Sequence, residues 1–205
     1  AELGKFSDML FEKRKSKGMT LEQATELCKL PIYFAGFMLE TDMVKVVVGG
    51  NVSSTGDIIR ASIFTVGVAA GISIVSSYFI MVMKDGRKLC FADCAVNPDP
   101  TDAQLADIAI ISAKNYGAVT GEEPKVAMLS FSTNGSATHP LVDKVISATK
   151  IIREKAPELQ VDGEMQLDAA IIPSIGERKF KGSTVAGKAN VLVFPSYREG
   201  FPNVV

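Results

Sequence analysis

Short apolar runs alternate with helical segments along this chain of 205 residues, and the short loops between them leave few folds open. Residues 126–131 form a continuous apolar run, which is typical of a strand buried on both faces in a parallel sheet. Residues 44–48 and 190–194 predict two further strands, and residues 140–155 predict a helix with one apolar side. This alternation predicts an α/β fold with a mostly parallel sheet.

Local signals mark where several helices begin and end. Thr20 and Thr101 each stand three residues before a glutamine, which is the capping-box pattern of a helix start. The helix after Thr101 is expected to run to about Asn115, and Gly18 is expected to end the first helix of the chain. The other predicted elements are helices over residues 32–40, from Asp57 and over 166–172, a strand over 159–161, a loop over 117–124 and a glycine-rich turn after 172.

Residues 61–83 contain no charged side chain, and this length would be enough to cross a bilayer, which needs about 20 apolar residues. Glycines and hydroxyl side chains interrupt the stretch, however, and the turn Asp85-Gly86 separates its end from a second apolar run. Two apolar runs around an Asp-Gly turn predict a β-hairpin. We therefore expect a helix end, a turn and a buried strand in a soluble chain, with no membrane partner.

The charge balance and the few potential metal ligands exclude several classes of function. Lys and Arg number 22 against 23 Asp and Glu, so the net charge is −1 and the basic surface of a general nucleic-acid binder is absent. The single histidine and the cysteines Cys28, Cys90 and Cys94 do not form a metal-ligand pattern, so no metal is predicted. Charged residues from Glu2 onward do not resemble a secretory signal. Reduced, buried thiols in a cytoplasmic protein are the expectation.

Two loops share a design that can bind an anion. In residues 49–56 and 132–136, an apolar run leads through glycine and hydroxyl residues toward a predicted helix. Backbone N–H groups at a helix N-terminus attract anions, and Ser or Thr hydroxyls add donors. Neither loop matches the nucleotide-binding glycine patterns, and small polar residues also fill ordinary loops. Anion binding and a purely structural role both stay open for each loop.

Two arginines stand near these signals. Arg60 is expected in the opening turn of the helix that begins at Asp57, where the helix dipole disfavours a cation. Recognition of a phosphate and an ion pair with Asp57 are both consistent with that position. Arg14 lies in the basic run of residues 13–17, for which a solvated helix C-terminus is the simpler interpretation.

Other polar residues give weaker signals. Asp162, Glu164 and Asp168 could supply paired carboxylates for a metal or a proton transfer, but carboxylates at strand ends and helix caps are common. His139 precedes a proline and is expected to be a surface or capping residue. The serines have no visible His–Asp partners, so a serine-hydrolase triad has no support.

Seven segments, taken in their order along the chain, resemble the phosphate acetyl/butyryl transferase family. They cover residues 10–21, 51–60, 71–77, 91–98, 128–136, 161–166 and 185–195. The resemblance implies two α/β domains with mostly parallel sheets and a cleft between them, as in isocitrate and isopropylmalate dehydrogenases, usually in a homodimer. Residues 1–73 would be the later part of the first domain. Residues 74–205 would be the second domain without its C-terminal portion, so the fold would be incomplete at both ends.

The resemblance also implies a reaction and its residues. It predicts reversible transfer of an acetyl group between coenzyme A and inorganic phosphate, with the coenzyme A thiolate attacking acetyl phosphate directly. Because that attack is direct, no enzyme nucleophile and no metal would be needed. No cofactor would be bound, since coenzyme A or acetyl-CoA is a substrate. Arg14 and Arg60 match the family's two active-site arginines, so the resemblance favours an active-site role for Arg14 over a solvated helix C-terminus. The matched substrate-binding residues are Ser54, Thr55, Ser132, Thr133, Gly135 and Ser136.

The chain also departs from the family pattern. An aspartate that would deprotonate the thiol, and a neighbouring serine–arginine pair, are expected beyond Pro195, but residues 197–205 do not resemble that continuation. Arg60 is followed by Ala61, where the family usually has proline. Two alternatives therefore stay open. One is transfer of butyryl or another short acyl group, and the other is a non-catalytic acyl-CoA-binding regulatory domain.

Overall fold

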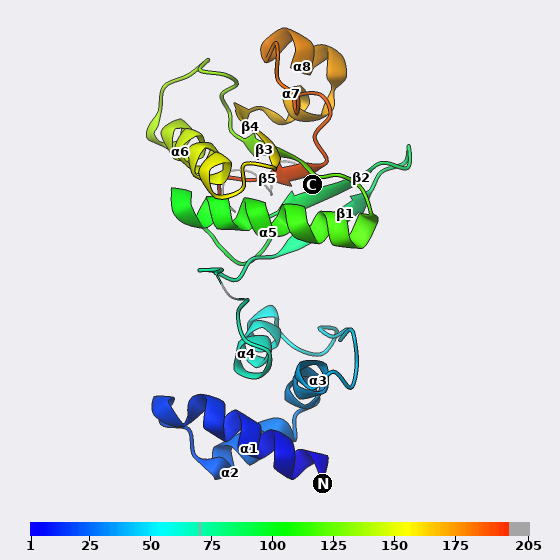
Figure 1. The fold of residues 1–205 in the computed structure, drawn as a ribbon, viewed down its shortest axis with the longest axis vertical. Helices are drawn as coiled ribbons and strands as arrows, with labels where there is room; N and C mark the ends of the chain where they lie inside the picture. Colours follow the sequence, from blue (N-terminus) through cyan, green and yellow to red (C-terminus); the bar gives the residue numbers. More distant parts are fainter. Residues whose placement is uncertain (70, 197–205) are drawn as a thin grey trace. The chain divides into compact units, whose positions relative to one another are not determined.

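The computed structural model describes residues 1–69 and 71–196. The chain packs as two compact units, the first over Ala1–Gly71 and the second from Ile72 onward. Figure 1 shows the elements of both units. That these units correspond to the two predicted domains, residues 1–73 and 74–205, stays a prediction.

The described part of the first unit is built from helices (Figure 1). Gly18, in the left-handed conformation with φ 83°, ends the first helical segment as expected. The capping box at Thr20 is also confirmed, because Thr20 Oγ1 accepts from Gln23 N while Gln23 Oε1 accepts from Thr20 N. The helical elements are α1 Glu2–Arg14 with a 3-10 turn Lys15–Lys17, α2 Leu21–Cys28, α3 Pro31–Glu40 and α4 Thr55–Thr65.

The strand predicted over residues 44–48 is wrong. These residues form no regular element, and Val46 and Val48 are 73% and 93% exposed. A strand needs a hydrogen-bonded neighbour, and within the described residues of the first unit there is no other strand to pair with it. The apolar run was therefore a misleading signal. All regular elements among the described residues of the first unit are helices, and the α/β character of the chain comes from the second unit.

The second unit contains a sheet in the order β1-β2-β5-β3-β4. β2, β5, β3 and β4 pair in parallel, whereas β1 pairs with β2 in antiparallel register, with Tyr78 opposite Ala92 and Val82 opposite Lys88. The α/β class and the predicted β-hairpin are therefore confirmed. The strands are β1 Tyr78–Val82, β2 Lys88–Ala92, β3 Lys125–Leu129, β4 Gln160–Met165 and β5 Val191–Val193.

Helices cover both faces of this sheet (Figure 1). One core joins the inner sides of α5 Asp102–Thr120 and α6 Pro140–Lys155 to sheet residues such as Val126 and Val191. The core on the other face includes Leu129 and Leu192 and residues of α7 Leu167–Ile171, with residues of α8 Pro173–Lys179 packed against it. The end of β3, which leads into residues 132–136, is thereby fixed within the sheet.

Several predicted boundaries in the second unit need correction. The helix α5 runs to Thr120 rather than Asn115, and Gly121, with φ 73°, ends it. The glycine-rich turn expected after residue 172 is in part the helix α8, which begins with Pro173 in its first turn. β1 is only half-buried rather than buried, because it lies at the edge of the sheet. Across the described residues, no helix combines the length and the apolarity that a membrane crossing requires.

The three cysteines are free and buried. Burial raises the pKa of Cys90 to about 12, with a smaller contribution from Cys94, so this thiol stays protonated at neutral pH. We expect Cys90 to react with iodoacetamide far more slowly in the native chain than in urea, as measured by mass spectrometry of the labelled peptides. Rapid native labelling of Cys90 would contradict its burial.

Candidate functional site

Arg14 and Arg60 are presented by two helices of the first unit. Arg14 is the last residue of α1, and Arg60 lies in the second turn of α4. The expectation that Arg60 lies in an opening turn is wrong, because α4 begins at Thr55 and Ser54 caps it by accepting from Asp57 N at 3.1 Å. The helix dipole therefore does not disfavour Arg60 at this position, because the dipole effect is confined to the first turn.

The ion pair considered for Arg60 is not formed. Asp57 instead accepts a hydrogen bond from Ser54 Oγ at 2.7 Å. No ion pair of Arg60 with any residue in the described ranges is present, and the Arg60 side chain is exposed. The guanidinium is therefore available to an external anion.

Arg14 differs from the lysines of its basic run. Its guanidinium carbon lies 3.9 Å from the centroid of the Phe64 ring, and its Nε atom is buried without a hydrogen-bond partner. Lys15, in contrast, is exposed and pairs with Glu12. Lys15 fits a solvated helix C-terminus, but Arg14 does not. The interpretation of Arg14 from its basic run alone is therefore wrong.

Tyr33 of α3 experiences the charges of both arginines. Burial raises the pKa of the Tyr33 hydroxyl, and the positive charges of Arg60 and Arg14 partly offset that rise, while Asp57 adds to it. The Tyr33 ring also packs edge-on against Phe64, with 6.2 Å between centroids. Arg14 thus packs on Phe64, Phe64 packs on Tyr33, and Tyr33 lines one pocket with Arg60.

Each arginine lines a pocket of the first unit. The Arg14 pocket has a volume of about 720 Å³ and includes Phe64 and Gln23. The Arg60 pocket has a volume of about 430 Å³ and includes Tyr33 and Ser54. Leu27 lines both pockets, so they are neighbours. Thr55, the other residue predicted here, is exposed at the first position of α4.

The approach of α3 to α4 sets the spacing of this site. A Cβ at Gly36 would lie 2.3 Å from Thr65 Oγ1 and 2.9 Å from Thr65 Cβ. Gly36→Ala is therefore expected to separate the helices and to lower the free energy of unfolding by about 1–3 kcal/mol. Urea denaturation checks this, with Gly4→Ala as the control because nothing lies within 4 Å of a Cβ there. Equal stability of the two variants would contradict the close approach.

The loop of Ser132, Thr133, Gly135 and Ser136 follows β3 in the second unit and is held by Glu164 of β4. Ser132 Oγ and Gly135 N each donate to Glu164 Oε1 at 2.8 Å. Thr133 N donates to Ser136 Oγ at 3.0 Å, which closes the loop on itself. Glu164 is 3% exposed, so a buried carboxylate already occupies two donors that an external anion would use.

The loop also does not lead directly into a helix N-terminus. The helix α6 begins at Pro140 and is capped by His139, whose Nδ1 accepts from Leu141 N at 3.2 Å. The capping role expected for His139 is therefore confirmed. The anion-binding design read from the sequence is not the arrangement found for residues 132–136, and a role of this loop in substrate binding stays a prediction.

The remaining carboxylates considered from the sequence have structural partners. Asp162 pairs with Arg153 at 2.6 Å, and Asp168 pairs with Lys179 at 2.8 Å. No cluster of three or more potential metal ligands occurs in the part of the chain that the structure describes. These residues stabilise the second unit rather than form a shared carboxylate site.

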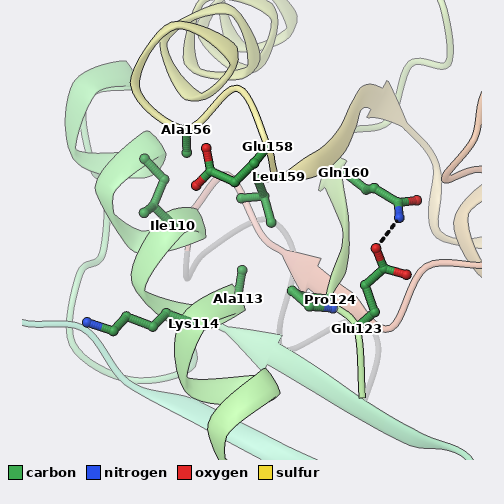
Figure 2. A pocket seen from close by; sticks show the side chains of 9 residues that line it. All are labelled: Ile110, Ala113, Lys114, Glu123, Pro124, Ala156, Glu158, Leu159 and Gln160. Atoms are coloured by element: carbon green, nitrogen blue, oxygen red, sulfur yellow. Dashed lines mark hydrogen bonds between the residues drawn. The ribbon is translucent and has the colours of Figure 1, made fainter. Parts of the chain in front are cut away.

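A further pocket, with a volume of about 370 Å³, lies between α5, α6 and the amino ends of β3 and β4 (Figure 2). Its apolar lining includes Ile110 and Leu159, and at its rim Gln160 Nε2 donates to Glu123 Oε1 at 2.6 Å. Open parallel sheets bind ligands beyond the carboxyl ends of their strands. We therefore assign this pocket no part in the site.

Sequence reasoning missed Phe64 and Tyr33 as neighbours of the arginines. Phe64 stands four residues after Arg60, a spacing that places both on one side of a helix. That signal was available in the sequence, but the contact between Phe64 and Arg14 joins residues that are distant in the chain. Tyr33 carried no signal beyond its place in a predicted helix.

Comparisons with known proteins agree with the seven segments. The family model described as phosphate acetyl/butaryl transferase matches residues 1–201. A phosphate acetyltransferase of Thermoanaerobacterium thermosaccharolyticum is 46% identical over 201 residues, which are 96% of this chain and 61% of that protein. One of Clostridium acetobutylicum is 47% identical over 195 residues, covering 93% of this chain and 59% of that protein.

A solved structure extends the likeness to the fold. A phosphotransacetylase from Streptococcus pyogenes superposes with a TM-score of 0.89 at 37% identity, over 99% of this chain and 61% of that one. The chain thus spans about three fifths of the length of these relatives. Because the family model covers nearly every residue, the chain belongs to the phosphate acetyl/butaryl transferase family.

Proposed function

We propose that the chain transfers an acetyl group reversibly between coenzyme A and inorganic phosphate. The observation that carries the proposal is the pair Arg14 and Arg60, which line neighbouring pockets without a carboxylate partner among the described residues. Two such guanidinium groups suit a substrate with several anionic oxygens, because each can donate two parallel hydrogen bonds. The names of the relatives point to the same chemistry.

The chemistry we propose needs no enzyme nucleophile. The coenzyme A thiolate attacks the carbonyl carbon of acetyl phosphate, the new C–S bond forms, and the C–O bond to phosphate breaks. Negative charge grows on the carbonyl oxygen and on the departing phosphate, where Arg14 and Arg60 would stabilise it. Acetyl-CoA and phosphate are released, and the reverse reaction follows the same steps. Coenzyme A is a substrate in this scheme, and no bound cofactor or metal takes part.

The predicted substrate-binding residues would divide into two groups. Ser54 and Thr55, at the start of α4, would contact the phosphate beside Arg60 through backbone N–H groups, since the Ser54 hydroxyl already donates to Asp57. Ser132 and Thr133 are buried and would shape the loop, whereas Gly135 and Ser136 are exposed and would contact substrate. Because Glu164 occupies the Gly135 N–H, we propose that this loop contacts neutral parts of the substrate rather than its phosphates.

The larger assembly follows from the same proposal. We infer a two-domain fold of the isocitrate and isopropylmalate dehydrogenase kind, with the active site in the cleft between domains, in a cytoplasmic homodimer that serves acetate metabolism. The aspartate and serine–arginine pair of the family would complete the site. They are expected after Pro195, and residues 197–205 lie outside the described residues. Sedimentation of the purified chain tests the dimer.

Two alternatives make different predictions. Transfer of butyryl or another short acyl group would give faster release of coenzyme A from butyryl-CoA than from acetyl-CoA, whereas the relatives' names favour acetyl. A non-catalytic acyl-CoA-binding domain could also use two unpaired guanidinium groups, for the phosphates of coenzyme A, but it would release no coenzyme A when phosphate is added. Phosphate-dependent release of coenzyme A, followed with a thiol reagent for both acyl-CoA substrates, tests the proposal. Preference for butyryl-CoA would overturn the acetyl assignment.

A further inference from the structure

Phe64 packs against the guanidinium of Arg14 and lies one helical turn from Arg60. We propose that Phe64 is a positioning residue that holds Arg14 beside Arg60 for binding of phosphate, an inference that rests on the proposed function. The proposal concerns orientation: Phe64 acts through Arg14 rather than by donating to the phosphate.

The contact is close enough to fix the Arg14 head group. The distance of 3.9 Å from Cζ to the ring centroid lies well within the range of about 6 Å over which a cation is attracted to an aromatic face. Over residues 1–69 and 71–196, no carboxylate pairs with Arg14, and its Nε has no hydrogen-bond partner. The aromatic contact is therefore the interaction that determines where this guanidinium lies.

The neighbouring lysines form ion pairs with carboxylates, whereas Arg14 forms none among the described residues. Lys13 pairs with Glu40 at 2.7 Å and also donates to the Thr65 carbonyl, while Lys15 pairs with Glu12. A carboxylate that held Arg14 would compete with phosphate for the same N–H donors. An aromatic face attracts the cation without occupying those donors, so the guanidinium edge stays available for bidentate binding.

Phe64 is itself well held. Tyr33 meets it edge-on, at an interplanar angle of 68°. Phe64 also packs on the core of the first unit that includes Phe6, Phe37 and Ala61. Since residues four apart share one side of a helix, α4 presents Arg60 directly and fixes Arg14 through Phe64. The helix α4 thus carries Arg60 and also supplies the ring on which Arg14 of α1 packs.

Phe64→Leu tests the proposal, since it keeps apolar volume and removes the aromatic face. We expect the dissociation constant of the full chain for inorganic phosphate to rise about 2- to 30-fold, the range that a cation–π contact corresponds to. Phe64→Tyr, which keeps the ring, should bind phosphate like the wild type. The matched control is Phe34→Leu, because Phe34 is half-buried on the same core but contacts Phe6 rather than Arg14.

A second readout does not depend on phosphate. In the free chain, the side-chain Hε resonance of Arg14 should show an upfield ring-current shift, which Phe64→Leu removes and Phe34→Leu retains. Equal losses of phosphate affinity in the two leucine variants would overturn the positioning role alone. So would an Arg14 Hε chemical shift that is unchanged in Phe64→Leu. A wild-type chain that binds no phosphate would overturn the proposed function, even with the Arg14 resonance shifted as expected.

Discussion

Arg60→Ala is expected to lower the rate of acetyl phosphate formation by about 10²-fold or more, because removal of one preorganised donor to a charged transition state costs that much. Arg60 is exposed, forms no ion pair among the described residues and lines a pocket with Ser54 and Tyr33. Its loss should therefore reduce kcat with little change in stability. Steady-state kinetics and thermal unfolding of the same preparation measure both quantities.

Two further variants serve as controls for the effect of Arg60→Ala on the rate. Arg178→Ala removes an exposed arginine from α8 in the second unit and should leave the rate unchanged. Arg60→Lys keeps the charge but not the planar pair of donors, so its rate should lie between those of the wild type and Arg60→Ala. Unchanged kinetics of Arg60→Ala would show that this side chain does not stabilise the transition state.

Glu164→Ala is expected to lower the free energy of unfolding by about 1–3 kcal/mol. The substitution removes the acceptor of the buried Ser132 hydroxyl and of the N–H of the exposed Gly135, and an unpaired buried polar group costs about 1–3 kcal/mol. Urea denaturation followed by circular dichroism measures the loss. The same variant should also weaken coenzyme A binding if the proposed contacts of the loop are correct.

Glu164→Gln separates the hydrogen bonds from the charge. The amide oxygen of glutamine can accept from both Ser132 and Gly135, so most of the stability should remain. Glu177→Ala, which removes an exposed carboxylate from α8, should cost less than about 0.5 kcal/mol. A Glu164→Ala chain as stable as Glu177→Ala would contradict the account of the loop.

The sequence predicted those elements whose signals are local. Thr20 and Thr101 were recognisable caps because their partners stand three residues away, and the hairpin was recognisable because one Asp-Gly turn joins its strands. Residues 44–48 misled because a strand depends on a neighbour that no local pattern reveals. The helix α8 was hidden because Gly176 made a helical segment resemble a turn.

The residues of the candidate site were also only partly predictable from the sequence. The resemblance identified Arg14 and Arg60, whereas the pattern around Arg14 alone favoured a solvated lysine-rich end. The contact of Arg14 with Phe64 joins α1 to α4, and no periodicity within either helix predicts it. Glu164 was noticed only as one carboxylate among several, because its bonds to Ser132 and Gly135 require β3 and β4 to be paired.

The most direct test of acetyl transfer is formation of acetyl phosphate from acetyl-CoA and inorganic phosphate by the purified chain. The reaction is followed as hydroxamate after addition of hydroxylamine, with Arg60→Ala in parallel. We expect the wild-type chain to form acetyl phosphate only when acetyl-CoA and inorganic phosphate are both present. Arg60→Ala should form almost none. Binding of coenzyme A without acetyl phosphate formation, or equal product from the wild type and Arg60→Ala, would contradict it.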